Sequence, residues 1–372
     1  MTVGHPGQDR PASRDIPCLD GLRTVADGFV LCHHDSYSLP FRWAAPRLYE
    51  DVLGNGHIGV SLFFVLSGYL ITRLMLREWD ATGRVELGAF YRRRARRIIP
   101  AYVAFLLVVG GGAVAGLLDV DGWAIAASGT YTWNYRHLFW PPVAGQALWY
   151  LGHTWSLCIE AQFYLLWPLA FRLAGPRPAA WLSLAAVAAS PVVRVAHYHF
   201  FPADPGRIGV MLHTWADPLL TGCLLALGRR LTPAAVAAVC RPVAAFWACT
   251  LLAVIVSPLL SQRLRGAYML PVGLTAENVC LAVILGHLLE RPTGRVGLVL
   301  DSAPLRYLGT RSYSIYLWQV LFIGPFDWQQ AWLPFPLNFT LILLVAEASY
   351  RLIERPFMAS RSRPATPDRS GP

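Results

Sequence analysis

The feature that most constrains this chain is a series of long apolar segments. A helix needs about 20 mostly apolar residues to cross the hydrocarbon core of a bilayer. Clear segments of this kind cover residues 57–76, 98–118, 148–171, 242–262, 266–289 and 328–350, and weaker ones cover 19–37, 178–200, 208–228 and 310–326. We therefore predict an all-α integral membrane bundle of about ten transmembrane helices.

The composition agrees with a polytopic membrane protein. Only 15% of the residues are charged, against about 25% in soluble domains, and 55% are hydrophobic. These values disfavour a cytosolic enzyme, a secreted disulfide scaffold and a fibrous protein. The net charge of +10 is what cytoplasmic loops of a hydrophobic chain usually hold, so we expect no nucleic-acid partner.

The distribution of arginine predicts the orientation. Short cytoplasmic loops are enriched in basic residues. With the N-terminus inside, 24 of the 32 basic residues fall on the cytoplasmic side, and the outer loops hold only Arg42, Arg47, Arg136, Arg207, Arg263 and Arg265. We therefore predict a cell-membrane protein with both termini in the cytoplasm. The expected organisation is a cytoplasmic tail over 1–18, a membrane domain over 19–356 and a disordered cytoplasmic tail over 357–372.

The first segment carries ionisable side chains, which are costly in a membrane and mark function by default. Arg23 and His34 are eleven residues apart, so they share one helical face with a rise of about 16 Å between them. Asp27 is four residues after Arg23, a spacing suited to an ion pair. Two interpretations remain open: a structural Arg23–Asp27 pair with an interfacial His34, or a functional site.

Two further motifs also allow two interpretations each. Ser67 and Gly68 lie in the apolar segment HIGVSLFFVLSGYLIT, where small residues permit close helix packing; a catalytic Ser67 is the alternative. The segment AFYRRRARRIIP holds five arginines in six positions. Such a cluster sets orientation or contacts anionic lipid, and the arginine fork also suits the phosphates of a nucleotide-containing donor.

The segment around 148–169 places two more candidates on one predicted span. His153 and Glu160 are seven residues apart, two helical turns, and so share a face. A buried structural pair and a catalytic or acceptor-binding carboxylate are both compatible with this spacing. Asp217 and Glu277 are interpreted as structural. No cysteine or histidine spacing suggests a metal site, and none is expected.

These segments, taken in order, resemble the membrane acyltransferase 3 family of bacterial O-acyltransferases. The resemblance lies in LDGLRTVA, FFVLSGYLIT, FYRRRARRIIPAY, HTWSLCIEAQFYLLWPL, SYSIYLWQ and IERP. It implies about ten spans and transfer of an acyl group from acyl-CoA to a hydroxyl of a sugar, a glycan or a natural product. It also implies that acyl-CoA is the donor substrate and that no cofactor is bound permanently.

The resemblance also implies roles for particular residues. The family's Arg-(ten residues)-His signature matches Arg23 and His34. Its Arg-x-x-Arg pair matches Arg94 and Arg97, with Arg93 and Arg96 at the same spacing, and its acid after Trp-Ser-Leu is Glu160.

The chain also departs from the family pattern. Gln319 stands where many members have His, and Asp27 and His33 stand where apolar residues are usual. The chain ends soon after Pro356, so we expect it to lack the extracytoplasmic domain that is fused to some members.

The expected mechanism follows from these roles. His34 takes the proton of the acceptor hydroxyl, and Arg94, Arg97 and Arg93 hold the coenzyme phosphates. The pantetheine arm passes Arg23, and Glu160 either orients His34 or binds the acceptor. The alternative function is a transporter or flippase for a glycolipid or natural product, in which the intramembrane charges form a substrate path.

Overall fold

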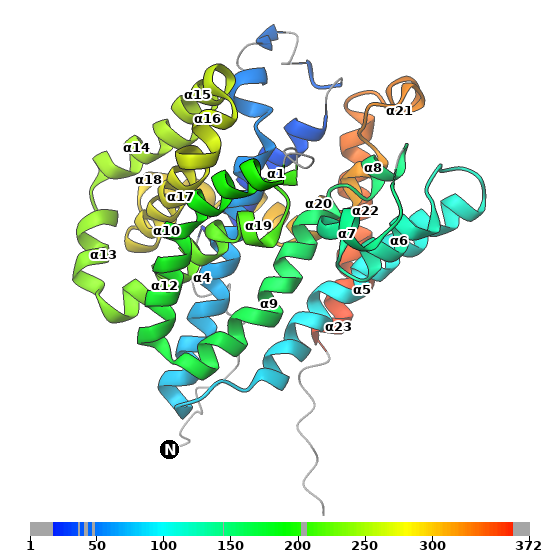
Figure 1. The fold of residues 1–372 in the computed structure, drawn as a ribbon. Helices are drawn as coiled ribbons and strands as arrows, with labels where there is room; N and C mark the ends of the chain where they lie inside the picture. Colours follow the sequence, from blue (N-terminus) through cyan, green and yellow to red (C-terminus); the bar gives the residue numbers. More distant parts are fainter. Residues whose placement is uncertain are drawn as a thin grey trace, which may run out of the picture. The chain divides into compact units, whose positions relative to one another are not determined.

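The computed structural model describes residues 18–35, 38–40, 44–46, 49–143, 145–201 and 207–359. Within these residues every regular element is helical and no strand occurs, which confirms the predicted all-α class (Figure 1). The two predicted tails fall almost wholly outside the described residues.

Six helices are long and apolar enough to cross a membrane. They cover Gly56–Thr82, Leu87–Val114, Thr154–Ala174, Pro176–Phe200, Val243–Leu264 and Gly266–Glu290. Each overlaps one of the predicted segments. The total of ten spans and the side of the membrane on which the termini lie stay predictions.

The described residues group into two compact units. Unit 1 takes its residues from Met1–Val85 and Leu166–Ser312, and unit 2 takes them from Glu86–Leu165 and Tyr313–Pro372. Unit 1 contains α1 (Leu19–His34), η1 (Tyr49–Leu53), α4 (Gly56–Thr82), α10 (Pro176–Phe200), α11 (Leu212–Trp215), α12 (Asp217–Leu231), α13 (Pro233–Cys240), α14 (Val243–Leu251), η4 (Leu252–Val256), α15 (Ser257–Leu264), α16 (Gly266–Tyr268), η5 (Met269–Gly273), α17 (Leu274–Glu290), α18 (Arg295–Leu300) and α19 (Ala303–Gly309).

Unit 2 is smaller and also helical. It contains α5 (Leu87–Val114), α6 (Gly122–Gly129), η2 (Trp133–Tyr135), α7 (Arg136–Phe139), α8 (Ala147–Tyr150), η6 (Gln319–Leu321), α21 (Asp327–Trp332), α22 (Leu337–Ser349), η7 (Tyr350–Glu354) and α23 (Arg355–Ala359). Two helices contribute residues to both units, α9 (Thr154–Ala174) and α20 (Ser312–Trp318).

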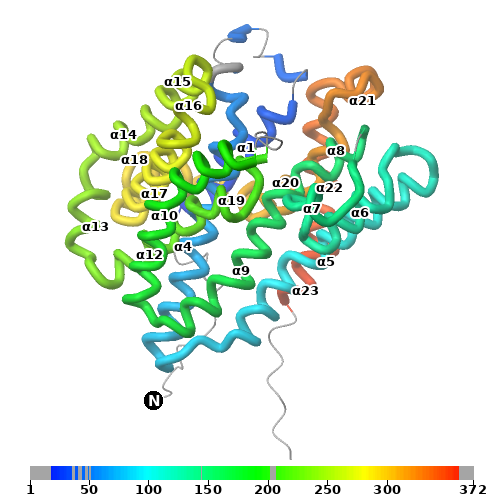
Figure 2. The backbone as a smooth tube through the Cα atoms, viewed as in Figure 1, coloured from blue at the N-terminus to red at the C-terminus, as the bar shows by residue number. Residues whose placement is uncertain are grey.

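The core of unit 1 is built around α4, which packs most extensively against α12 and also against α1 and α17 (Figure 2). Small residues allow the closest approach. A Cβ atom added to Gly68 would lie 1.9 Å from the carbonyl oxygen of Leu219, and one added to Gly222 would lie 2.1 Å from that of Val65. Glycine at both positions therefore lets the two backbones touch, as in membrane helix pairs.

One predicted span is wrong in its position. The sequence suggested a continuous apolar helix over 328–350, but α21 ends at Trp332 and the next helix begins only at Leu337. Pro334 and Pro336 lie between them, and proline lacks the backbone N–H that an uninterrupted helix requires. The helical stretch instead runs from Leu337 through η7 and α23 to Ala359.

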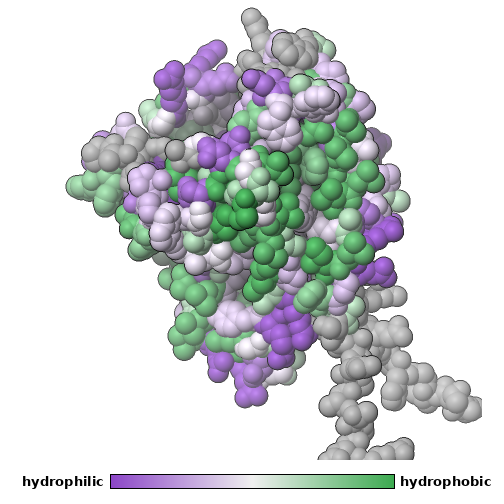
Figure 3. All heavy atoms as spheres, turned by 90° about the vertical axis from the view of Figure 1, so that its right-hand side faces the viewer, coloured by the Kyte–Doolittle hydropathy of each residue, from purple (hydrophilic) through white to green (hydrophobic). Residues whose placement is uncertain are grey.

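The surface of the long helices is apolar. Leu107 of α5 is 69% exposed and Trp181 of α10 is 72% exposed. Hydrophobic side chains cover much of the face shown in Figure 3. Water disfavours so much exposed apolar surface, whereas lipid accommodates it. These helices thus have the surface expected of membrane-spanning segments.

Candidate functional site

In unit 1, α1 carries Arg23 and His34 along one uninterrupted helix. The Arg23 guanidinium donates to Asp20 Oδ1 at 2.5 Å. The i−3 and i+4 spacings both allow an ion pair, and Asp20, at i−3, is a hydrogen-bonded partner of Arg23. Asp27 is 4% exposed, lies against the Ser312 hydroxyl and interacts electrostatically with Arg23.

His34 is the last residue of α1 and is half-buried. Its ring lies against the ring of His33, with centroids 5.5 Å apart. His33 is exposed, and its Nδ1 is 2.6 Å from the carbonyl oxygen of Gly54. A Cβ atom on Gly56 would lie 2.5 Å from His33 Cβ, so the end of α1 packs directly on the start of α4.

A second histidine lies at the start of α4 and was not among the sequence candidates. His57 Nε2 is 2.7 Å from Glu277 Oε2, and the Ser257 hydroxyl donates to Glu277 Oε1 at 2.5 Å. The Glu277 side chain is 1% exposed and that of His57 is 26% exposed. A buried carboxylate therefore orients a partly accessible imidazole, as in catalytic dyads. The sequence signal that could have identified this pair is a histidine at the start of one apolar segment, His57, and an acid inside another, Glu277.

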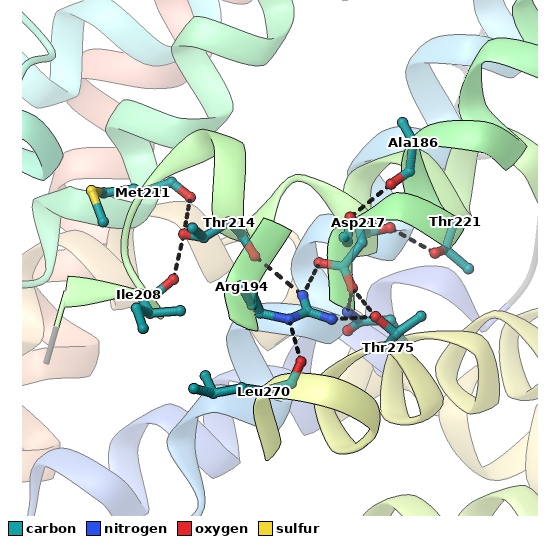
Figure 4. Close-up of polar contacts among 11 residues, drawn as sticks. Ala186, Arg194, Ile208, Met211, Thr214, Asp217, Thr221, Leu270 and Thr275 are labelled. Atoms are coloured by element: carbon teal, nitrogen blue, oxygen red, sulfur yellow. Dashed lines mark hydrogen bonds and ion pairs between the residues drawn. The ribbon is translucent and has the colours of Figure 1, made fainter. Parts of the chain in front are cut away.

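The most deeply buried charges of unit 1 form a network around Arg194 and Asp217 (Figure 4). The Arg194 guanidinium donates to Asp217 Oδ1 at 3.1 Å, to the carbonyl oxygens of Leu270 and Thr214, and to the Thr275 hydroxyl. Thr275 and Asn278 in turn donate to Asp217 Oδ2. The pair is fully satisfied and joins α10, α12 and α17, so it stabilises the fold. The structural interpretation of Asp217 is therefore supported.

Ser67 is half-buried on α4, one residue before the close contact at Gly68. The contact at Gly68 supports the packing interpretation of this motif, and a catalytic Ser67 stays an alternative. Thr72, one turn further along α4, accepts a hydrogen bond of 2.9 Å from the Trp167 indole of α9. This part of α4 is thus occupied by structural contacts.

In unit 2, the basic face of α5 meets the acid of α9. The Arg94 guanidinium lies over the rings of Phe90 and Tyr164, with its central carbon 5.7 Å and 5.2 Å from their centroids. The Tyr164 hydroxyl donates to Glu160, and Glu160 and Arg97 interact electrostatically with Arg94. The structure therefore brings together Arg94, Arg97 and Glu160, which the sequence had treated as separate motifs. Arg93 also interacts with Arg94, whereas Arg92 is exposed.

The predicted geometry of His153 is wrong, because α9 begins at Thr154 and His153 lies in the turn before it. The two-turn spacing from Glu160 consequently does not place both side chains on one helix. His153 is buried, and its ring lies 5.4 Å from that of Phe105 and 5.6 Å from that of Tyr316. The Tyr316 hydroxyl donates to the His153 carbonyl oxygen at 3.0 Å.

Unit 2 also buries an acid that the sequence candidates omitted. Glu354, in the segment IERP, is buried and accepts a hydrogen bond from the Ser314 hydroxyl. The neighbouring Tyr313 hydroxyl donates to the Ile98 carbonyl oxygen of α5 at 2.9 Å. Gln319, where a histidine was noted as usual, is buried and donates to the Tyr316 carbonyl oxygen at 3.1 Å.

The arrangement offers two kinds of chemistry. In unit 1, histidines beside the α1–α4 contact offer imidazole groups that can accept or donate a proton. In unit 2, half-buried guanidinium groups on α5 offer fixed forks for phosphate or carboxylate oxygens.

Comparison of the sequence with known proteins identifies the family of this chain. The model of an acyltransferase domain, that of the acyltransferase 3 family, matches residues 16–347. The peptidoglycan O-acetyltransferase OatA of Listeria monocytogenes is 31% identical over 93% of this chain and 56% of its own. The putative peptidoglycan O-acetyltransferase YrhL of Bacillus subtilis is 30% identical, over 92% and 55%. The O-acetyltransferase OatA of Staphylococcus aureus is 29% identical, over 92% and 57%.

This chain spans about half the length of these curated relatives. No solved structure matches it significantly. The apolar helices and the membrane acyltransferase relatives identify a multi-pass protein of the cell membrane. Since the family model covers most of the sequence, the chain belongs to the acyltransferase 3 family.

Proposed function

We propose that this protein is an integral-membrane O-acyltransferase that moves an acyl group from acyl-CoA to a hydroxyl of a sugar, glycan or natural product. The observation that carries the proposal is α1, which presents the cation of Arg23 and the imidazole of His34 on one uninterrupted helix. Eleven residues at about 100° each return to nearly the same face. Acyl transfer requires these two groups, a base and a positive charge.

The proposed reaction balances without a permanently bound cofactor. His34 accepts the proton of the acceptor hydroxyl, whose oxygen attacks the thioester carbonyl carbon. The C–S bond then breaks, and the leaving thiolate takes the proton from the imidazolium. The products are the ester and free coenzyme A. Arg23 supplies the positive charge near the path of the donor, where Asp20 fixes its guanidinium.

We assign donor binding in unit 2 to Arg93, Arg94 and Arg97. Guanidinium forks match phosphate oxygens, and a guanidinium held against aromatic rings loses less conformational entropy on binding. The contacts of Glu160 support a positioning role: it accepts from Tyr164 and attracts Arg94, and so holds the fork in place.

The names of the relatives make peptidoglycan the first acceptor to test, and a glycosylated small molecule the second. The transporter alternative has less support, because the family and the named relatives are acyltransferases.

The test of the base is His34→Ala with His33→Ala as the matched control. Purified protein is incubated with labelled acyl-CoA and candidate acceptors, and acceptor-dependent release of free CoA is measured. General-base catalysis contributes about 10²–10⁴-fold, so His34→Ala should retain at most about one hundredth of the rate. His33→Ala should stay close to the parent. A folded His34→Ala protein with full activity would refute the assignment.

The test of donor binding is Arg94→Ala, with the exposed Arg92→Ala as control. The expected result is a higher KM for acyl-CoA with a smaller change in kcat, because the lost contact is with the bound donor. Glu160→Gln should raise the same KM in part. Equal KM values for the Arg94 and Arg92 variants would contradict the proposed role.

A further inference from the structure

Unit 1 holds a cavity that none of the roles above uses. Its volume is about 370 Å³, within the ~300–1,000 Å³ range of small-molecule sites. It lies between the second half of α4, the end of α12 and the end of α17. Its polar lining consists of Arg73, Arg77, Arg229, Arg230, Tyr69 and Asp80, and the rest is apolar. We call it the four-arginine pocket.

Two of its arginines pair with acids, Arg230 with the exposed Asp80 and Arg229 with the partly buried Glu290. Arg230 forms a fork with the Asp80 carboxylate through three contacts of 2.8–3.1 Å. The hydrogen bonds to Asp80, together with its negative charge, raise the pKa of Arg230. Arg229 donates to Glu290, which also accepts from Arg241 at 3.0 Å. These contacts fix two guanidinium groups at the end of α12 before any ligand arrives.

The other two arginines lie one turn apart on α4. Arg73 and Arg77 have the i, i+4 spacing that places side chains on one helical face. Both interact electrostatically with the Tyr69 hydroxyl, as Arg229 does. Four arginines against one aspartate give the lining a formal charge of +3. A basic cluster that only sets membrane orientation needs neither a cavity nor convergence from two helices.

We propose that the four-arginine pocket binds an anion that carries at least two negative charges on phosphate groups. Guanidinium forks pair with phosphate oxygens through strong charge-assisted hydrogen bonds, and a lining of +3 matches a diphosphate better than a single carboxylate. A soluble diphosphate and a lipid headgroup that carries two phosphates both meet this requirement. The proposal does not depend on the proposed acyl transfer.

The experiment uses the full chain in phosphatidylcholine nanodiscs, with inorganic pyrophosphate as the probe and calorimetry as the readout. The parent protein should bind pyrophosphate, and Arg73→Gln/Arg77→Gln should bind it at least tenfold more weakly. The control is Arg84→Gln/Arg295→Gln, which removes the same charge from exposed positions of unit 1. The control should bind within about twofold of the parent.

A second variant keeps the proposal testable if the glutamine pair disturbs insertion. Arg73→Lys/Arg77→Lys retains the charge, and therefore the orientation signal, but loses the planar fork. It should bind more weakly than the parent. Absence of pyrophosphate binding by the parent, or equal loss in the control pair, would overturn the proposal.

A second arm identifies the source of the phosphate. Nanodiscs that also contain cardiolipin, a lipid whose headgroup carries two phosphates, are titrated with pyrophosphate. A weaker apparent affinity in the parent, absent in the glutamine pair, supports the proposal with a lipid headgroup as occupant. An unchanged affinity supports it with a soluble anion as occupant.

Discussion

Replacement of Arg194 by methionine should destabilise unit 1 strongly. Arg194 and Asp217 are both 0% exposed, and the closest contact between them is 3.1 Å. At an effective dielectric constant of about 20, two unit charges at that distance attract by ~5 kcal/mol. Methionine fills much of the same volume but leaves the Asp217 carboxylate with only neutral donors, and it leaves the carbonyl oxygens of Thr214 and Leu270 without the guanidinium.

The expected loss follows from the same contacts. Removing one partner of a buried pair costs about 3–5 kcal/mol. At about 2–4 °C per kcal/mol for a unit of this size, the unfolding midpoint should fall by about 6–20 °C. Arg177→Met, at an exposed position of the same helix, is the matched control and should change the free energy of unfolding by less than ~0.5 kcal/mol.

Buried cysteines provide the assay. Cys223 of α12 is fully buried and becomes accessible to a thiol-reactive dye only when the helices separate. Dye fluorescence is recorded against temperature for the parent, Arg194→Met, Asp217→Leu and the double variant. The double variant should lose less than the two single losses combined, because it leaves no isolated charge. Additive losses, or an Arg194→Met midpoint within 2 °C of the parent, would refute this reasoning.

Two further predictions concern unit 1. Gly68→Ala should lower the free energy of unfolding by about 2 kcal/mol or more, and with it the unfolding midpoint. The reason is that the new Cβ would lie 1.9 Å from the Leu219 carbonyl oxygen. Gly28→Ala, with nothing within 4 Å, should be neutral or slightly stabilising, and a loss as large as that of Gly68→Ala would contradict the steric argument. His57→Ala should destabilise by about 1–3 kcal/mol by removing a partner of the buried Glu277 carboxylate, and His57→Gln should recover part of this in thermal unfolding. An unchanged midpoint in His57→Ala would show that the contact is dispensable.

The long helices could be predicted from the sequence because lipid imposes a simple rule. A span needs an unbroken apolar run, and α4 and the helical run Val243–Leu264 follow this rule. The last predicted span failed for a local reason, since the average hydropathy of 328–350 hides Pro334 and Pro336. The hydropathy averaged over a window measures how well the side chains suit lipid, and it does not register that proline lacks a backbone N–H.

The candidate site was predictable only where a contact is local in sequence. The arginines of α5 and the acid of α9 stood out as motifs, but their meeting through Tyr164 depends on how two helices pack. The partners of Arg194 and His57 come from other helices. No spacing within one segment encodes such pairs. The hydrogen bond of Arg23 to Asp20 depends on side-chain rotamers, which sequence spacing leaves open.

The close approach of Gly68 to Leu219 and of Gly222 to Val65 has a consequence for motion. At this crossing the two main chains are separated by less than the width of one methyl group, so neither helix can slide or rotate without striking a carbonyl of the other. We therefore expect α4 and α12 to move together as one rigid body. Any conformational change that admits or releases a substrate in unit 1 should therefore involve neighbouring helices that pack less closely.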